Sequence, residues 1–440
     1  MRFGYNIIFV LFFWLSAPYY FLKMWRRGDW RAGFGQRFAR YSPEFKSALA
    51  QRPVVWMHAV SVGEVGVCWQ LIRALEPHLS AFQILVSTTT STGMAELQRL
   101  LPPHIQRMYY PADFAGGVRR AMKAVQPRAI ILVEAELWPN FLSQAIAARC
   151  PLFLVNARFS KTSLRNYRLF RFFFSPIFAK FSGVGCQQPD DVPGITGLGF
   201  PAEAVHVTGN LKFDAAQSAP GATLDVPALL RQIGVGAEAL LLVAGSTHAG
   251  EEAILAGILT RLRRRFPNLF LVLVPRHFER TKEVARELET RGIKFICRSD
   301  IPAGEPIAPG QLECLLVNST GELKFFYEQA TLVFVGKSLT AQGGQNPIEP
   351  AALGKAVVVG PNMQNFASTI RAFMAGQAVV RVQNEAELEQ AVAELLADDR
   401  RRAELGARAR MVVQQNLGAT ERTVRFIVGG LSFNPNPLDS

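Results

Sequence analysis

The chain has 440 residues, more than one ordinary hydrophobic core contains, so two or three domains are expected. Its formal net charge of +13 implies an anionic partner, and because no nucleic-acid-binding spacing occurs we expect phospholipid or a phosphorylated substrate and no nucleic acid. The five cysteines are dispersed without a CxxC pair, and the six histidines show no metal-ligand spacing. These features argue against a disulfide framework and predict neither a structural metal nor a cofactor.

The N-terminal segment is uninterrupted by charge and rich in aromatic residues. Residues 7–22 read IIFVLFFWLSAPYYFL, and Lys23, Arg26 and Arg27 follow. No basic region of several residues precedes this run and no clean cleavage site follows it, which argues against a cleaved signal peptide. A bilayer span needs roughly 20 apolar residues, so the length is marginal. We expect residues 1–27 to form a membrane anchor, spanning or monotopic, with its basic flank on the cytoplasmic side. The alternative is a helix packed in the core.

Short apolar runs alternate with helical stretches in two successive sets, a pattern typical of parallel, doubly wound sheets. The first set of predicted strands is Val54–Ala59, Phe82–Ser87, Ala129–Glu134, Leu152–Asn156 and His206–Thr208. The second set is Leu240–Gly245, Leu269–Val274, Ile293–Cys297, Leu315–Val317, Leu332–Gly336 and Ala356–Gly360. A linker rich in Ala, Pro, Ser and Gly separates the sets near 215–225. We therefore expect an α/β fold of two Rossmann-like domains, 28–217 and 226–425, with a tail at 426–440.

The loop after the first predicted strand presents Glu64 between Gly63 and Gly66. These glycines would let the chain turn sharply, and the positive end of the helix dipole would keep the carboxylate ionised, as a general base requires. A helix-charge interaction without chemistry is the alternative. The hydroxyl-rich turn at 87–93 either binds phosphate or caps the next helix.

Glu134 and Glu136 follow the third predicted strand. Carboxylates at i and i+2 share a face of a strand, although a bend toward a helix would separate them. Two charged residues at a strand end that faces a cleft are rarely structural, so we favour a functional role for this pair. Lys212, after the glycine turn at Gly209, is suited to bind an anion in a cleft between the domains.

A basic and aromatic region begins at Arg158. Arg165, Arg168 and Arg171 have the spacing of one helical face, and bulky aromatic residues lie between them. This composition indicates an interfacial helix near anionic lipid, or a buried helix with a solvated basic stripe.

Several loops of the second domain have residues suited to anions. Ser246, Thr247 and His248 form a small-residue anion loop or an ordinary N-cap. Arg276, after Pro275, is suited to a bidentate grip on phosphate. The turn Thr320-Gly321-Glu322 offers free backbone amides.

The stretch 343–350, GGQNPIEP, is the strongest single indication of a nucleotide or sugar-nucleotide site. Gly343 and Gly344 would let the backbone approach a ligand, and Pro347 would begin a helix whose N-terminus attracts an anion. Glu349, one turn into that helix, suits the diol of a ribose. A turn without a ligand is the alternative.

These motifs occur together in one order: HAVSVGEV, EAELWPN, NARFSKTS, VTGNLKFD, GSTHAGEE, LVPRH, TGEL and VGKSL…GGQNPIEPAALG. With them the chain resembles the 3-deoxy-D-manno-octulosonic acid (Kdo) transferases of lipopolysaccharide synthesis, glycosyltransferase family 30, from the N-terminal segment to about residue 425. Departures from the family pattern are Asn318-Ser319-Thr320 in place of Asp-Thr-Met, Lys337 in place of Gly, and Gln345 in place of His.

The resemblance implies a GT-B fold, in which two Rossmann-like domains face an inter-domain cleft. The N-terminal domain would take a bisphosphorylated lipid A precursor and the C-terminal domain would bind CMP-Kdo, for an inverting, metal-independent transfer at the cytoplasmic face of the inner membrane. By motif, Glu64 corresponds to the proton acceptor, and Glu134 and Lys212 to transition-state stabilisers. The CMP-contacting segments correspond to Pro275, Arg276, Thr320, Gly321, Glu322, Asn346, Pro347, Ile348 and Glu349.

Two other functions fit the motifs less well. One is a GT-B transferase that uses a UDP- or GDP-sugar, and the other is a non-catalytic, two-lobed nucleotide-sugar-binding protein. A dehydrogenase is disfavoured, because no GxGxxG follows a first strand with an acidic residue about 20 positions later.

Overall fold

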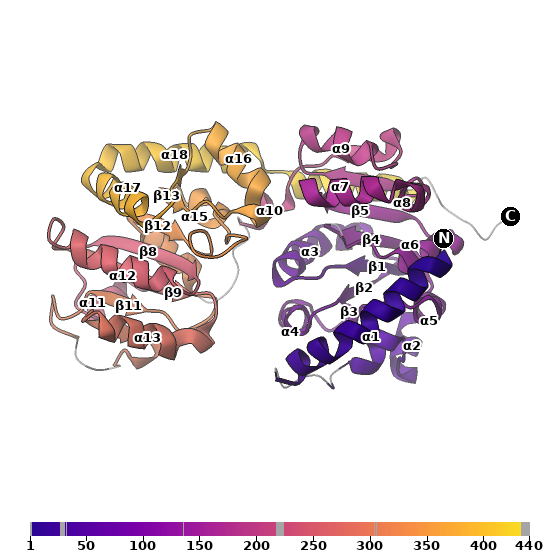
Figure 1. Cartoon of the computed structure of the whole chain (residues 1–440), viewed down its shortest axis with the longest axis horizontal. Helices are drawn as coiled ribbons and strands as arrows, with labels where there is room; N and C mark the ends of the chain where they lie inside the picture. Colours follow the sequence, from indigo (N-terminus) through magenta and orange to yellow (C-terminus); the bar gives the residue numbers. More distant parts are fainter. Residues whose placement is uncertain are drawn as a thin grey trace. The chain divides into compact units, whose positions relative to one another are not determined.

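The computed structural model describes residues 2–26, 31, 33–134, 136–216, 224–302, 304 and 306–432. The chain forms two compact units: unit 1 contains residues 1–215 and 418–440, and unit 2 contains residues 216–417. Each unit is a parallel sheet with helices on its faces (Figure 1), which confirms the predicted α/β class. Most of the expected linker, residues 217–223, lies outside the described residues.

Unit 1 contains a parallel sheet in the order β3-β2-β1-β4-β5-β6-β7, in which the direction of winding reverses between β1 and β4. Its strands are β1 (Val54–His58), β2 (Gln83–Thr88), β3 (Gln106–Tyr109), β4 (Pro127–Val133), β5 (Leu152–Ala157), β6 (Gly183–Cys186) and β7 (Val205–Val207). Its helices are α1 (Arg2–Arg26), α2 (Pro43–Leu49), α3 (Val62–Leu75), α4 (Ser91–Leu100), α5 (Ala115–Val125), α6 (Pro139–Ala147), α7 (Lys161–Leu169), α8 (Arg171–Phe178), α9 (Val192–Thr196), α10 (Leu211–Ala215) and α19 (Ala419–Ser432). The sequence did not predict β3 and β6, because the first begins with polar residues and the second contains two glycines.

Unit 2 repeats this design in the order β10-β11-β9-β8-β12-β13-β14, with the reversal between β8 and β12. Its strands are β8 (Leu240–Thr247), β9 (Leu269–Pro275), β10 (Phe295–Cys297), β11 (Cys314–Leu316), β12 (Leu332–Val335), β13 (Val357–Val359) and β14 (Val380–Arg381). Its helices are α11 (Val226–Gln232), α12 (Glu251–Leu262), α13 (Thr281–Thr290), α14 (Leu323–Gln329), α15 (Ile348–Ala352), α16 (Ala367–Ala375), α17 (Glu385–Ala397) and α18 (Asp399–Gln415). Ligands of such sheets bind beyond the carboxyl ends of the strands at the reversal, which directs attention to the loops there.

The C-terminal segment corrects the predicted domain boundary. Residues 426–432 are not a tail, because they continue α19, and α19 packs on unit 1 rather than on the second domain. The ring of Phe426 lies 5.9 Å from that of Phe153, and Asp214 accepts hydrogen bonds from the backbone amides of Gly418 and Thr420. The rest of the expected tail, 433–440, lies outside the described residues.

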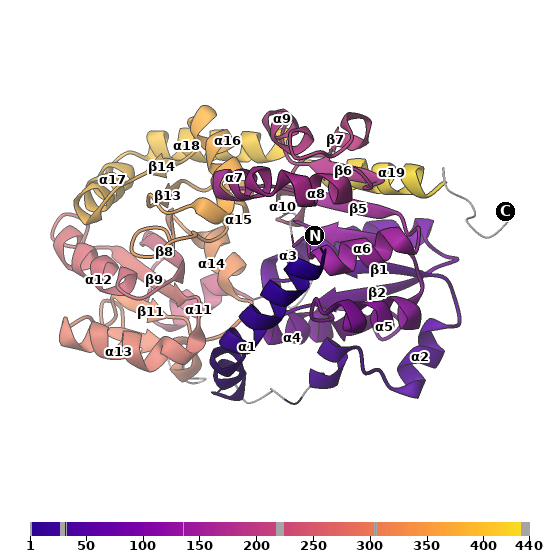
Figure 2. The ribbon, with the colours of Figure 1, turned by 45° about the vertical axis from the view of Figure 1, so that its right-hand side comes forward.

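The predicted anchor is the helix α1, which runs diagonally across one side of unit 1 (Figures 1 and 2). Tyr5 donates a hydrogen bond of 2.8 Å to the buried Asp113, and the ring of Phe9 packs edge-on against that of Phe114. Phe13 lies on the same docked face, with its ring centroid 4.8 Å from that of Phe114. Among the described residues, no helix combines the length and the apolar character needed to cross a membrane. The basic flank, Lys23, Arg26 and Arg27, lies outside the residues whose side chains are described.

The basic and aromatic region forms two short helices rather than one. Phe170 ends α7 and precedes α8, so Arg171 begins a new helix and does not continue the face of Arg165 and Arg168. All three arginines are exposed, whereas Tyr167 and Phe174 pack against the core of unit 1.

Candidate active site

Glu64 lies in the first turn of α3, directly after β1. The hydroxyl of Ser61 accepts a hydrogen bond from the amide of Glu64, and the Glu64 carboxylate accepts bonds from the Ser61 hydroxyl (2.8 Å) and the amide of Val60 (3.0 Å). Ser61 thus caps the helix, and its hydroxyl and the amide of Val60 together hold the carboxylate at the helix start. Gly63 lies inside the helix with Gly66, so the turn comes before them and not at them.

The pKa of Glu64 is raised to about 7, chiefly by burial and then by the negative charge of Glu134. Burial and the nearby carboxylates outweigh the two hydrogen bonds, so this carboxylate is less readily ionised than its position at a helix N-terminus predicts. A carboxylate with a pKa near 7 is well suited to general-base catalysis at neutral pH.

Glu134 and Lys212 form an ion pair beside Glu64. Glu134 follows β4 in a left-handed conformation, with φ of 63°, and its Oε1 lies 2.7 Å from Nζ of Lys212 on α10. Asn156 is buried at the end of β5, where it donates to Oε1 of Glu134 and accepts from the amide of Leu211. It therefore links the segment after β4 to the start of α10.

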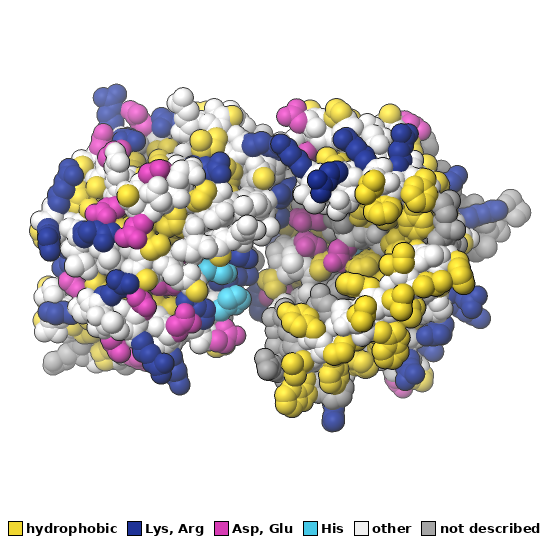
Figure 3. All heavy atoms as spheres, viewed as in Figure 1, with side chains coloured by type: hydrophobic (Ala, Val, Ile, Leu, Met, Phe, Trp, Pro, Cys, Tyr) yellow, Lys and Arg dark blue, Asp and Glu magenta, His cyan; other side chains and the backbone are white. Residues whose placement is uncertain are grey.

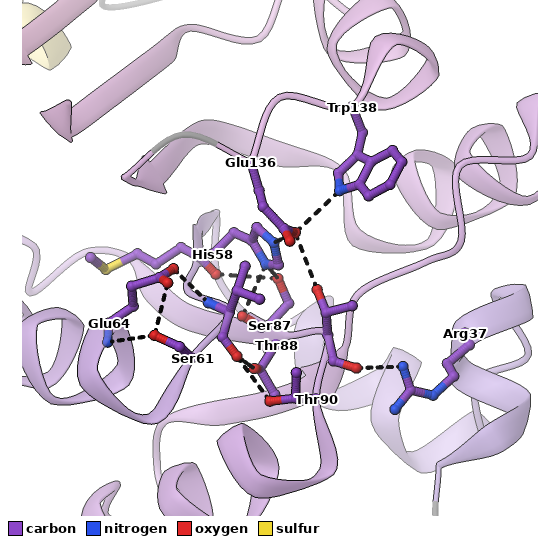
Figure 4. A network of polar contacts seen from close by, with 12 residues as sticks. Arg37, His58, Ser61, Glu64, Ser87, Thr88, Thr90, Glu136 and Trp138 are labelled. Atoms are coloured by element: carbon purple, nitrogen blue, oxygen red, sulfur yellow. Dashed lines mark hydrogen bonds and ion pairs between the residues drawn. The ribbon is translucent and has the colours of Figure 1, made fainter. Parts of the chain in front are cut away.

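Glu136 turns to a different set of partners (Figure 4). Its Oε2 accepts hydrogen bonds from Nε1 of Trp138 (3.2 Å) and Oγ1 of Thr89 (3.4 Å), and it lies 3.5 Å from Nε2 of the buried His58. Burial opposes ionisation of Glu136, but the contacts with His58, Trp138 and Thr89 outweigh it, so the pKa of Glu136 is lowered. The bend after β4 thus separates the two carboxylates.

The hydroxyl-rich turn at 87–93 makes internal contacts. Thr88 and Thr90 both donate to the carbonyl of Val60, and Thr90 caps α4 by accepting from the amide of Gly93. Of the two interpretations of this turn, the structure favours helix capping.

In unit 2, the segments after β8 and β9 lie side by side, since Thr247 is opposite Pro275 in the sheet. The imidazole rings of His248 and His277 are 5.8 Å apart. Thr247 itself is buried, and its hydroxyl donates to Glu252, which also pairs with Arg280.

Glu251 joins the loops after β8 and β12. Its buried carboxylate accepts hydrogen bonds from four backbone amides, those of His248, Lys337, Ser338 and Leu339, at 2.7 to 3.0 Å. One carboxylate therefore fixes both segments at the reversal point of this sheet.

The GGQNPIEP segment leads into α15 as predicted, although Pro347 is the N-cap and the helix itself begins at Ile348. Asn346 donates to Oε1 of Glu349 at 2.9 Å, and burial raises the pKa of Glu349 against the opposing charges of Arg276 and Lys324. Gly343 and Gly344 both have positive φ, and a Cβ atom would meet the side chains of Asn365 and Met363, so the close approach that they allow is to other residues of the chain itself.

The remaining predicted donor segment, Thr320 to Glu322, precedes α14. Gly321 has a φ of 86°, and Oε2 of Glu322 accepts from Nε of Arg298 at 3.2 Å. The described residues contain no group of three or more His, Cys, Asp or Glu side chains that could hold a metal ion.

Most of the chain is similar to known transferases. Residues 32–215 match the family described as 3-deoxy-D-manno-octulosonic-acid transferase (kdotransferase), and residues 309–412 match glycosyl transferases group 1. A 3-deoxy-D-manno-octulosonic acid transferase of Bordetella pertussis is 35% identical over 422 residues, covering 93% of this chain and 95% of that protein. Its counterpart in Haemophilus influenzae is 32% identical over 414 residues, covering 89% and 93%. The chain belongs to the Kdo transferase family. It is accordingly a glycosyltransferase, as the motifs predicted.

Among solved structures, a putative UDP-N-acetylglucosamine 2-epimerase from Listeria monocytogenes superposes with a TM-score of 0.59 at 14% identity, covering 88% of this chain and 98% of that one. This likeness shows the fold alone, and with the group 1 match it supports the GT-B assignment.

The structure brings the three predicted catalytic residues of this Kdo transferase together in unit 1, and it gives them two neighbours that the sequence analysis did not select, His58 and Asn156. In unit 2, Glu251 was likewise not selected. Each ends a buried strand or begins the helix after one. A polar residue at such a position was the available signal, but nothing in the sequence said which partner it meets.

Proposed function

We propose that this Kdo transferase moves Kdo from CMP-Kdo to a hydroxyl of a lipid A precursor, with inversion and without a metal ion. Glu64 removes the proton from the acceptor hydroxyl while that oxygen attacks the anomeric carbon. The bond from this carbon to the CMP phosphate breaks, and its electron pair leaves with the phosphate. Glu134 and Lys212 stabilise the transition state.

The observation that carries this proposal is the state of Glu64. Its carboxylate is held by the Ser61 hydroxyl and the Val60 amide, pairs with no cation in the described part of the chain, and has a pKa raised to about 7. Glu134 is paired with Lys212, and the pKa of Glu136 is lowered rather than raised. Of the three carboxylates, Glu64 is therefore the one suited to accept a proton.

The donor side of the proposal uses unit 2. CMP carries a phosphate and a ribose, and the loops after β8, β9 and β12 supply Arg276, two histidines and the carboxylate of Glu349. The guanidinium of Arg276 suits the phosphate, and Glu349 with Asn346 suits the ribose hydroxyls. Competition by CMP against UDP and GDP distinguishes this donor from the alternative nucleotide sugars.

The experiment is transfer from CMP-Kdo to a tetraacylated, bisphosphorylated lipid A precursor, comparing the wild type with Glu64→Gln. Product from the wild type and a loss of about 10²–10⁴-fold in the variant would support both the reaction and the base. Transfer from a UDP- or GDP-sugar instead would overturn the donor assignment. Full activity of Glu64→Gln would overturn the role of Glu64.

The same proposal places the enzyme at the cytoplasmic face of the inner membrane, with anionic lipid as a partner. One face of α1 is docked on unit 1, and the other exposes Ile8, Phe12, Trp14 and Leu15. Tyr5 of α1 stacks on Phe173, which brings α1 beside α8, where Phe172 is exposed. Figure 3 shows this apolar surface along α1 and α8, with basic side chains next to it over α7.

Such a surface suits a helix that lies in the membrane interface. The test is flotation of the full chain with vesicles of anionic or zwitterionic lipid. Binding to anionic vesicles that weakens with salt would support the proposal, and absence of binding to both would contradict it.

A further inference from the structure

The loop after β12 contains a cation that the mechanism above does not use. Lys337 is half-buried and follows the strand in a left-handed conformation, with φ of 55°. Ser246, near the end of the neighbouring strand β8, is also left-handed, with φ of 57°. Residues with a Cβ atom adopt this conformation at a cost in free energy, and such residues cluster at functional sites. The two positions therefore direct attention to this edge of the sheet of unit 2.

One carboxylate oxygen brings Lys337 next to His248. Oε2 of Glu251 accepts hydrogen bonds from the amide of His248 at 2.9 Å and from that of Lys337 at 2.7 Å. The carbonyl of Lys337 accepts from the amide of Gly344 at 3.0 Å. A Cβ atom added to Gly343 would lie 3.5 Å from Cε of Lys337. The backbone of Lys337 is thus held on both sides, and its side chain lies along the glycine pair.

The ammonium of Lys337 is available to a ligand. No carboxylate in the described part of the chain forms an ion pair with it, and the nearby carboxylate of Glu251 is occupied by four backbone amides. Nδ1 of His248 lies 3.3 Å from the carbonyl oxygen of Ser246, which can only accept, so Nδ1 carries the ring proton. The pKa of His248 is lowered, chiefly by burial and also by the charges of Lys337 and His277. The neutral ring of His248 leaves Lys337 as the cation at this position.

Arg276 and Lys337 lie on either side of β8 at the same edge of the sheet. The amide of Arg276 donates to the carbonyl of Thr247 at 3.0 Å. The amide of Gly336, directly before Lys337, donates to the carbonyl of Gly245 at 2.9 Å. Because β8 lies between β9 and β12 and neighbouring strands are about 4.8 Å apart, the backbones of Arg276 and Lys337 are roughly 10 Å apart. Two long cationic side chains at this separation can reach two adjacent anionic groups of one ligand.

The proposed donor has two such groups, because Kdo is an acid and the anomeric carbon of CMP-Kdo bears both the carboxylate and the phosphate oxygen. The phosphate is assigned above to Arg276. We propose that Lys337 binds the carboxylate of the Kdo group through a charge-assisted hydrogen bond. This inference rests on the proposed function, since it names a further contact of the same donor. A neutral sugar on UDP or GDP lacks the carboxylate, so this contact favours a sugar acid. Lys337 departs from the family pattern, so the contact is a property of this chain.

The test compares CMP-Kdo with CMP, which keeps the phosphate and lacks the carboxylate. Lys337→Met keeps the Cβ atom and removes the charge. It should raise KM for CMP-Kdo by about 10-fold or more and leave the inhibition constant of CMP unchanged. Lys337→Arg, which keeps a cation, should recover part of the loss. Arg276→Met, at the phosphate, should raise both the KM for CMP-Kdo and the inhibition constant of CMP.

The matched control is Lys294, an exposed lysine of the same unit that precedes β10 and therefore lies at the opposite edge of the sheet. Lys294→Met should change neither the KM for CMP-Kdo nor the inhibition constant of CMP. KM for the lipid A precursor should stay unchanged in both lysine-to-methionine variants. Thermal unfolding shows whether each variant folds, and Lys337→Met should unfold close to the wild type because the left-handed residue keeps its Cβ atom.

An unchanged KM for CMP-Kdo in Lys337→Met would overturn the proposal. An equal rise in the inhibition constant of CMP would also overturn it, because Lys337 would then bind the nucleotide and not the sugar acid. The same holds for a rise in the acceptor KM alone. A wild type that transfers no Kdo would count against the proposed function itself, whereas an active wild type with an unaffected Lys337→Met would leave the proposed function intact.

Discussion

The ammonium of Lys212 lies 2.7 Å from Oε1 of Glu134, so the two residues that we propose as transition-state stabilisers are paired with each other. Both side chains are about one-quarter exposed or less, and Asn156 holds the pair in place through Glu134 and the start of α10. Their contributions to catalysis are therefore expected to depend on one another.

A double-mutant cycle tests this dependence. Lys212→Met and Glu134→Gln should each lower kcat/KM by 10-fold or more. The loss of kcat/KM in the double variant should be smaller than the product of the two single losses. The interaction energy should be roughly 1–3 kcal/mol, as for residues in contact. Independent, multiplicative effects would mean that the pair separates in the reacting enzyme.

The raised pKa of Glu64 predicts a cost in stability. The native state binds this proton more tightly than the unfolded state, so the stabilisation is full below the ordinary value of 4.5 and is lost as the pH rises to about 7. Between pH 4.5 and pH 8 the loss should be on the order of 3 kcal/mol.

Glu64→Gln removes this loss. Urea unfolding should show the variant gaining stability relative to the wild type between pH 4.5 and pH 8, while Glu287→Gln, an exposed glutamate on α13, should give a nearly constant difference. A constant difference for Glu64→Gln as well would contradict the raised pKa.

Glu251 should be needed to shape the donor loops. Glu251→Gln replaces one acceptor oxygen by an amide group and leaves some of the four backbone amides unpaired, each at a cost of about 1–3 kcal/mol. We expect a lower free energy of unfolding and a KM for the nucleotide sugar at least 10-fold higher, with the acceptor KM unchanged. Unfolding curves and steady-state kinetics measure both. An unchanged donor KM in a destabilised variant would limit Glu251 to a structural role.

Substitutions on the docked face of α1 should affect stability, and substitutions on its exposed face should affect membrane binding. Phe9 packs against Phe114 and Trp138, whereas Phe12, three residues later, is 59% exposed. Phe9→Ala should lower the free energy of unfolding by about 1–2 kcal/mol. Phe12→Ala should leave stability unchanged and weaken flotation with vesicles. The reverse pattern would show that the exposed face is not the lipid-binding face.

Lys337 occupies a position where the family often has glycine, and its φ is 55°. The left-handed conformation costs a residue with a Cβ atom roughly 1 kcal/mol, so Lys337→Gly should stabilise unit 2 by up to about that amount. Lys337→Ala serves as the control, because it removes the charge but keeps the Cβ atom, and should bring no gain. A loss of stability in Lys337→Gly would mean that the lysine side chain contributes more than the strain costs.

The sequence alone determined the two parallel sheets, because continuous apolar runs between helices can be buried in few other ways. It also determined the loops at the carboxyl ends of β1, β4, β8, β9 and β12, since strand ends carry the polar residues. It did not predict β3, β6, β14 (Val380–Arg381) or the docking of α19, because these depend on contacts with distant segments, such as Phe426 with Phe153.

Only the tertiary structure decided the roles within those loops. Glu134 and Glu136 are two residues apart in sequence, yet the bend after β4 directs one to Lys212 and the other to His58. Burial and neighbouring charges, not the residue type, then raise the pKa of Glu64 and lower that of Glu136. Proton affinity depends on the surrounding charges and solvent, and these are fixed only when separate strands meet.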